Sequence, residues 1–304
     1  VMDVISALAQ KRACLEKRAL LAQALRDGFR HFGFLEVDTP SLIPAPAQEE
    51  FIETIPAGSG FLRPSPELEM KQLLAAGYKR IFQFGPCWRA GERGRKHSEE
   101  FTMLEYYAAG FDYRKLMGLT CEILAEAAIR VNGSLTLNYQ GEEIDFSPES
   151  AEWLTVADAF NRYSPVSLDD ALAQDKFDEI MVVNIEPQLG RGHLTFLADY
   201  PASRAALARR SALNPDVAER WELYIAGIEL SNAFSELTDE KEQRQRFAEA
   251  AAFRCAHGMN NYPEAEAFFA ALHAGLPESS GNALGFDRLV MIFTDSDNID
   301  AVKF

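Results

Sequence analysis

Two strand-like segments joined by a charged loop constrain the fold of this chain more than any other feature. KRIFQFGPCWR at residues 79–89 is largely apolar, AGERGRKHSEE is polar, and FTMLEYYAAGF at residues 101–111 is largely apolar again. Such a run predicts an antiparallel pair of strands. On the second strand, a period of two places Phe101, Met103, Glu105 and Tyr107 on one face of the sheet.

The rest of the chain alternates between helical and strand-like patterns. A repeat of apolar residues every seven positions predicts an amphipathic helix over residues 4–32, with Gly33 as its end. Further helices are predicted over residues 66–77, 112–131, 155–180 with a break at Ser164-Pro165, and 238–257 with Thr238 at its start. Strand pieces or hairpins are predicted over residues 135–146, 180–187, 193–201 and 221–237, with a short helix or loop at 201–210 and a strand or turn followed by a helix at 279–293.

These elements predict one mixed domain. No internal repeat or long linker divides the 304 residues, and that length can bury a sizeable core. The strands do not alternate with helices in the rhythm of a parallel sheet. We therefore expect an α+β domain over residues 1–304, with a mostly antiparallel sheet flanked by helices.

Composition narrows the class of protein. The formal net charge is −16, so any contact with nucleic acid needs a local basic patch, although a few placed arginines can hold a nucleotide. No run of about 18 apolar residues is present, so no membrane span is expected. The N-terminus lacks the pattern of a signal peptide, and none of the four cysteines forms a CxxC pair. These features predict a cytoplasmic protein with reduced thiols.

The first group of candidate site residues lies at the charged loop. Arg89 follows an apolar strand, where a guanidinium favours a fixed anion, and Phe101 opens the returning strand, where its ring could stack on a base. Arg93, Arg95 and Lys96 lie between them. From the loop alone, a solvated basic surface is the ordinary interpretation, whereas the loop and both strands together favour a nucleotide site.

The second group is GNALGFDRLVM near the C-terminal end of the sequence. Gly281 and Gly285 permit a close approach of the backbone, and Arg288 starts an apolar helix. The same sequence pattern is also expected for a glycine turn followed by an Arg–Asp pair on the surface. Neither a Walker A loop nor a GxGxxG turn occurs, so ATP would have to bind by another architecture.

The third group is acidic and lies in and before GIELSNAFSELTDEKEQRQRF. Glu222 and Glu229 would hold magnesium through oxygen ligands beside a triphosphate. Glu236 with Glu67, Glu105 and Tyr107 would form an acid-rich pocket, which fits a small dicationic molecule.

Glu229 and Glu236 differ in strand parity, so a regular strand cannot direct both toward one site. Either residues 231–233 contain a bulge or the two acids serve different subsites, and the second explanation is favoured.

The order of these groups resembles the catalytic core of the class II aminoacyl-tRNA synthetases of the lysyl type, over nearly the whole chain. FLEVDTPSLIP is similar to motif 1, WRAGERGRKHSEEFTMLE to motif 2 and GNALGFDRL to motif 3. SPELEMKQLL and GIELSNAFSELTD are similar to segments typical of the lysine branch.

The resemblance is narrower still to the elongation factor P–(R)-β-lysine ligases, which lack the anticodon-binding domain of lysyl-tRNA synthetases. We expect that domain to be absent here, since the sequence begins at the helix before motif 1, and Ala283 stands where lysyl-tRNA synthetases typically have glycine. The resemblance implies ATP and magnesium as cofactors, lysine or β-lysine as substrate and elongation factor P as the acceptor. It also implies a homodimer formed through motif 1, with no tRNA and no membrane as partner.

The resemblance also implies roles for individual residues. Arg89 and Arg288 would hold the phosphates during catalysis, and Glu222 and Glu229 would bind magnesium. The substrate amino acid would contact Ser65, Glu67, Glu105, Tyr107, Asn232 and Glu236. ATP would contact Arg89, Glu92, Ser98, Phe101, Glu229, Leu230, Gly285 and Arg288.

Motif 2 departs from the family at two places. Arg89-Ala90-Gly91 stands where the family often reads RNE, with Glu92 one place later, and Ser98 replaces an asparagine. The adenine-side contacts of Glu92 and Ser98 are therefore open.

Three functions follow as hypotheses. The first is the elongation factor P ligase, and the second is a stand-alone adenylating enzyme that loads a tRNA or another carrier. The third is a catalytically silent synthetase paralogue with a regulatory role, which predicts loss of motif arginines or acids; Arg89, Glu222, Glu229 and Arg288 are all present. The choice between β-lysine and α-lysine, and the surface that binds the acceptor, stay open at this point.

Overall fold

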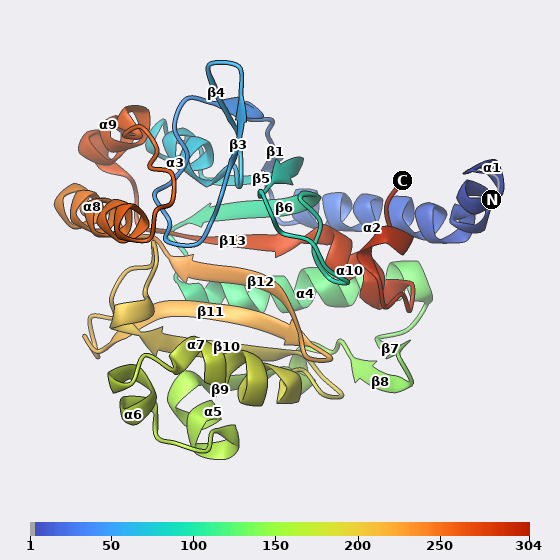
Figure 1. Ribbon diagram of the computed structural model, residues 1–304. Coiled ribbons are helices and arrows are strands. Elements are labelled where there is room, and N and C mark those ends of the chain that lie inside the picture. The colour runs from blue at the N-terminus through green and yellow to red at the C-terminus, as the bar shows by residue number, and fades with distance from the viewer. Residues whose placement is uncertain (1–3) are drawn as a thin grey trace.

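An eight-stranded sheet forms the centre of the computed structural model, which describes residues 4–304 (Figure 1). The strand order is β1-β5-β6-β13-β12-β11-β10-β9. Every neighbouring pair is antiparallel except β1–β5 and β9–β10, the pairs at the two edges. The strands are β1 (Leu35–Glu36), β5 (Arg80–Trp88), β6 (Glu100–Ala109), β9 (Glu152–Thr155), β10 (Thr195–Pro201), β11 (Val217–Ile225), β12 (Ile228–Ser235) and β13 (Ser279–Gly285).

Three helices cover one face of this sheet (Figure 1). They are α2 (Arg12–His31), α4 (Tyr113–Asn132) and α10 (Phe286–Phe293), with α1 (Val4–Gln10) ahead of α2. Alternate residues of β6, Leu104, Tyr106 and Ala108, face these helices in the largest buried cluster. No helix within residues 4–304 is both long and apolar enough to cross a membrane.

Two smaller clusters pack at the ends of the sheet. One involves α3 (Glu67–Ala75) and α9 (Glu266–Gly275), with α8 (Glu240–Ala256) beside them. The other involves α5 (Val156–Tyr163), α6 (Leu168–Ala173) and α7 (Phe177–Ile180) against β9 and β10. Small sheets complete the chain: β2 (Leu42–Ile43), β4 (Gly60–Leu62) and β3 (Ile55–Ala57), and the hairpin of β7 (Thr136–Tyr139) and β8 (Glu142–Asp145).

The structure confirms the α+β class, the central strand pair and most of the predicted helices, and it corrects three predictions. Residues 180–187 are helical turns and not a strand, because Met181 and Ile185 are buried while Val182 and Val183 point to solvent. The helix α9 was not predicted at all. The helix α8 is capped by Asp239, which accepts from the Glu242 amide, and not by Thr238.

The strand β12 contains a bulge at Leu230. Its pairing with β11 shifts between Leu223, opposite Ser231, and Tyr224, opposite Glu229. The extra residue shifts the alternation of side chains by one position. Glu229 therefore shares a face of the sheet with Asn232, Phe234 and Glu236. The sequence analysis favoured separate subsites over a bulge and considered a bulge only within residues 231–233. The observed bulge lies one residue before that segment.

Candidate active site

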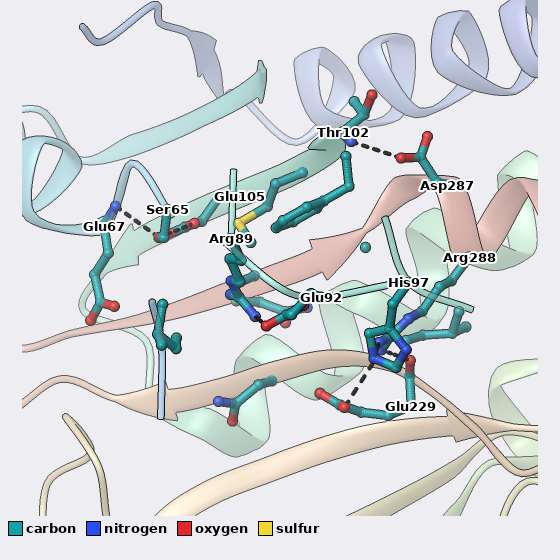
Figure 2. Close-up of a pocket in the computed structure, with 18 of the residues that line it drawn as sticks. Ser65, Glu67, Arg89, Glu92, His97, Thr102, Glu105, Glu229, Asp287 and Arg288 are labelled. Carbon is teal, nitrogen blue, oxygen red and sulfur yellow. Dashed lines mark hydrogen bonds and ion pairs between the residues drawn. The ribbon is translucent and has the colours of Figure 1, made fainter. Parts of the chain in front are cut away.

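One cavity on the open face of the sheet collects nearly all the predicted site residues (Figure 2). It lies over β6, β12 and β13, and it is closed on one side by the loop that follows β5. The predicted residues that line it are Ser65, Glu67, Arg89, Glu92, Ser98, Phe101, Glu105, Tyr107, Glu229, Leu230, Asn232, Gly285 and Arg288. Glu222 and Glu236 do not line it.

Arg89 lies at one end of the cavity with unused hydrogen-bonding capacity. Its guanidinium carbon is 5.2 Å from the centroid of the Phe101 ring, and its nearest carboxylate, Glu92, is 3.7 Å away. Its Nε is buried and has no hydrogen-bond partner within residues 4–304. A buried, unsatisfied cationic donor is costly, so the site favours an anion at this position.

Arg288 adds positive charge at the same end. Its Nη1 donates to the backbone oxygen of Glu229 at 2.7 Å, and the Glu229 carboxylate is 3.5 Å away. Its Nη2 lies 2.6 Å from His97 Nε2. Burial, followed by the charge of Arg288, lowers the pKa of both Lys96 and His97. This excess of positive potential fits a polyphosphate.

A buried aspartate fixes the base of this cationic end. Asp287 accepts from the Thr102 amide at 2.8 Å (Figure 2) and forms an ion pair with Arg18 of α2 at 2.5 Å. The guanidinium of Arg18 lies 4.7 Å from the centroid of the Phe286 ring. The helix α2 therefore positions the start of α10, which carries Arg288.

The opposite end of the cavity is acidic. Glu105 accepts hydrogen bonds from the hydroxyl of Ser65 at 2.8 Å and from that of Tyr107 at 2.6 Å. Burial, with a contribution from the charge of Glu67, raises the pKa of Glu105 to about 8. Glu67 lies beside them and lines the cavity, so this end of the cavity suits an ammonium group.

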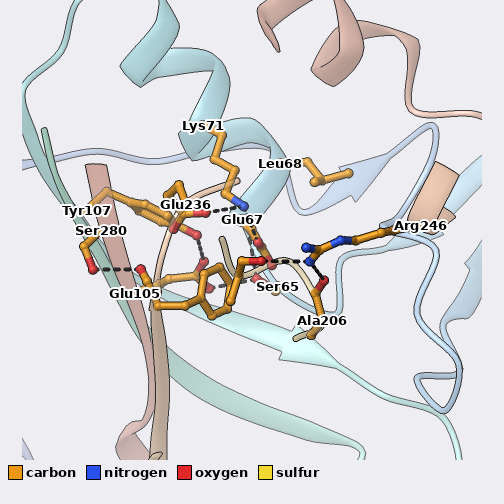
Figure 3. A network of polar contacts seen from close by, with 12 residues as sticks. Ser65, Glu67, Leu68, Lys71, Glu105, Tyr107, Ala206, Glu236, Arg246 and Ser280 are labelled. Carbon is orange, nitrogen blue, oxygen red and sulfur yellow. Dashed lines mark hydrogen bonds and ion pairs between the residues drawn. The ribbon is translucent and has the colours of Figure 1, made fainter. Parts of the chain in front are cut away.

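Behind the acidic end lies a buried lysine that the sequence analysis did not single out (Figure 3). The Nζ of Lys71 is 2.5 Å from Glu67 Oε1 and 2.5 Å from Glu236 Oε2, and neither Lys71 nor Glu236 has an exposed side chain. Burial alone would lower the pKa of Lys71, but the charges of Glu236 and Glu67 raise it above its usual value. In this structure Lys71 is therefore a cationic partner of Glu236.

The carboxylates of Glu222 and Glu229 differ in burial and in the number of their partners. Glu222 is buried and pairs with Arg220 at 2.6 Å, and it accepts from the hydroxyls of Tyr200 at 2.5 Å and Tyr224 at 2.7 Å. The side chain of Glu229 is 40% exposed. No group of three or more metal-ligand side chains occurs in the described part of the chain.

The donor type of this pair nevertheless fits magnesium. Mg²⁺ commonly takes one or two carboxylates and completes its shell with water and substrate phosphates. Burial raises the pKa of Glu222, Arg220 lowers it, and the neighbouring charge of Glu229 raises it further, so a cation between the two acids would relieve repulsion.

Asn232 and Ser98 have partners within the chain. Asn232 Oδ1 accepts from Arg220 Nε at 3.0 Å, and Ser98 Oγ accepts from Lys303 Nζ at 3.0 Å. Both residues also line the cavity.

The comparison with known proteins agrees with this geometry. Residues 3–304 match the family described as tRNA synthetases class II (D, K and N), so the chain belongs to that class of ligases. Within the class it belongs with the elongation factor P–(R)-β-lysine ligases. It is 39% identical to the one from Proteus mirabilis over 96% of this chain and 94% of that protein, and 38% identical to the one from Hamiltonella defensa over 95% and 93%. A lysine–tRNA ligase from Magnetococcus marinus is 36% identical over 96% of this chain but 63% of its own length.

Proposed function

We propose that the protein activates (R)-β-lysine, or lysine, with ATP and transfers it to a lysine side chain of elongation factor P. The observation that carries this proposal is the charge distribution of the active-site cavity: Arg89 and Arg288, each with one loosely held carboxylate, lie at one end, and Glu67 with the Lys71–Glu236 pair lies at the other. A molecule with a carboxylate in the middle and an ammonium at its far end fits between them. The relatives that match this chain over nearly their full length are named for this reaction.

The first step needs no side-chain nucleophile. The substrate carboxylate attacks the α-phosphorus of ATP, pyrophosphate leaves with the bonding pair, and an aminoacyl-adenylate forms. Arg89 would hold the α-phosphate and Arg288 the γ-phosphate, so both stabilise charge that develops on phosphate oxygens. Glu229 and Glu222 are the residues that would hold Mg²⁺, which supplies further neutralisation of the phosphates.

The remaining residues position the two substrates. Phe101 would stack on the adenine, and Glu92, Ser98, Leu230 and Gly285 would line the ATP site. Asn232 would orient the substrate carboxylate. Ser65, Glu67, Glu105 and Tyr107 would surround the amino groups. Glu236 would act on the distal ammonium through its negative charge from behind the cavity wall, where it pairs with Lys71.

A dimer is also part of the proposal. The segment similar to motif 1 contains two exposed leucines: Leu35 is 52% exposed and Leu42 is 51% exposed. Exposed apolar residues on short strands of this kind favour an interface with a second copy of the chain.

A second candidate function is the formation of lysine adenylate for tRNA. It is favoured by the match to lysine–tRNA ligases over 96% of this chain. The net charge of −16 gives tRNA binding no general electrostatic support.

ATP–pyrophosphate exchange with (R)-β-lysine, α-lysine and no amino acid tests the first step. We expect strong exchange with (R)-β-lysine, lost in Glu236→Gln, followed by transfer to purified elongation factor P and not to tRNA. Exchange that prefers α-lysine, with transfer to tRNA, would support the second candidate. No exchange with any diamino acid would refute both and would favour a catalytically silent paralogue.

A further inference from the structure

A second cavity lies next to the active-site cavity and shares a wall with it. Glu49, Ile52, Ala206 and Leu207 line both cavities. Glu49 is the only one of the four that carries a titratable side chain. It was not among the residues predicted from sequence.

The side chain of Glu49 has no hydrogen bond or ion pair to another residue of the described chain. The charged groups that act on it are Glu67 and Lys71 of α3, Arg89 after β5 and Arg220 of β11. Burial, reinforced by the charge of Glu67, raises the pKa of Glu49 to about 7. At neutral pH this carboxylate is therefore free to take up a proton.

The second cavity fits the side chain of a lysine. Apolar groups of Ile52, Phe177, Met181 and Phe247 line it, and they suit the methylene stem. Charged side chains of both signs line it as well. Arg220 pairs with Glu222 and Arg204 with Asp178, and Arg210 and Arg246 also line the cavity. The acids without an arginine partner in this lining favour a cationic head group; these are Glu50, Glu186 and Glu249. A lysine that enters by this route meets Glu49 where the two cavities join.

We propose that the acceptor lysine reaches the adenylate through this second cavity and that Glu49 takes the proton from its ammonium group. The inference rests on the proposed function, because it concerns the second step at the same site. The ammonium transfers a proton to the Glu49 carboxylate, and the freed nitrogen lone pair attacks the carbonyl carbon of the adenylate. The new C–N bond forms, the C–O bond to phosphate breaks, AMP leaves with the electron pair, and the second nitrogen proton passes to AMP or water.

Comparing Glu49→Gln with the wild type in the two half-reactions tests this inference. Glutamine keeps the shape and cannot accept the proton. We expect ATP–pyrophosphate exchange with (R)-β-lysine to stay within about threefold, whereas transfer to elongation factor P falls by about 10²-fold or more, as for loss of a general base. Wild-type transfer should also rise with pH through about 7, and the variant should lack this limb. Glu264→Gln makes the same change at a side chain that is 70% exposed and serves as the matched control.

Hydroxylamine separates proton transfer from a structural effect. It is an uncharged amine at neutral pH and needs no base before it attacks, so Glu49→Gln should form the hydroxamate as fast as the wild type. If exchange falls together with transfer, Glu49 belongs to the amino-acid site and the inference is wrong. Unchanged transfer to elongation factor P would also overturn it. Absence of exchange in the wild type would instead refute the proposed function itself.

Discussion

Lys71 Nζ lies 2.5 Å from Glu236 Oε2, and both side chains are fully buried. The same ammonium lies 2.5 Å from Glu67, which lines the active-site cavity. Lys71 thus connects an acid that can meet substrate to an acid that lies behind the cavity wall. From the cavity inward, the order is the Glu67 carboxylate, the Lys71 ammonium and the Glu236 carboxylate, so negative and positive charges alternate.

Lys71→Met should destabilise the protein strongly. Removal of one partner of a buried ion pair typically costs about 3–5 kcal/mol, because the other charge stays buried without compensation. Urea unfolding measures this loss. The double variant Lys71→Met/Glu236→Gln should recover part of it, and a cost below about 1 kcal/mol for Lys71→Met alone would contradict the buried pair.

Glu67→Gln should weaken binding of the diamino acid and leave ATP binding nearly unchanged. A hydrogen bond to a charged group contributes about 1.5–3 kcal/mol, so the KM for the amino acid should rise by roughly 10- to 100-fold. The KM values of both substrates in the exchange reaction measure this. An equal rise for ATP would show that Glu67 acts on the whole cavity and not on its acidic end.

Gly281→Ala should damage the acidic end of the pocket. A Cβ at position 281 would lie 2.2 Å from Tyr107 Cε1 and 2.6 Å from Glu236 Oε1, so one of these groups has to move. We expect a loss of stability of about 1–3 kcal/mol, as for overpacking, together with loss of exchange.

Gly118→Ala is the matched control for that variant. Gly118 lies within α4, and a Cβ there meets nothing within 4 Å, so alanine should stabilise the helix and leave exchange unchanged. Thermal unfolding and ATP–pyrophosphate exchange, measured on Gly281→Ala and Gly118→Ala, test these two expectations. Full activity in Gly281→Ala would contradict the close approach of Tyr107 and Glu236 to Gly281.

Glu105 should make the stability of the protein depend on pH. Its pKa rises from 4.5 to about 8 in the fold, so the native state binds more protons between these values and stability falls as pH increases. The effect is at most about 1.4 kcal/mol per pH unit. Urea unfolding at pH 5.5 and 7.5 should show a steeper fall for the wild type than for Glu105→Gln, and parallel curves would rule out a raised pKa.

Much of the fold follows from local patterns in the sequence. The strand pair around the charged loop has a clear period of two, and this period placed Phe101, Glu105 and Tyr107 on the face that lines the cavity. Residues 180–187 misled the prediction, because a run of β-branched residues favours a strand locally while their burial follows a helical period. Tertiary packing decides whether such a run forms a strand or a helix, and these packing contacts cannot be inferred from a single sequence.

The motifs of the resemblance supplied most of the residues that line the active-site cavity, although Glu222 and Glu236 do not line it. Lys71 stands four residues after Glu67, a helical spacing that does contain a signal for an ion pair. Glu49 lies in an irregular segment with no period, so only the structure shows that it joins two cavities.

The bulge at Leu230 also limits how this protein can vary. Because one extra residue resets the alternation of β12, the acid on the magnesium side and the residues on the amino-acid side depend on a fixed count of positions between them. Deletion of Leu230 or Ser231 would turn Asn232, Phe234 and Glu236 toward the opposite face of the sheet, although these three side chains would all be retained. We therefore expect this segment to accept substitutions in the course of evolution but no change in length.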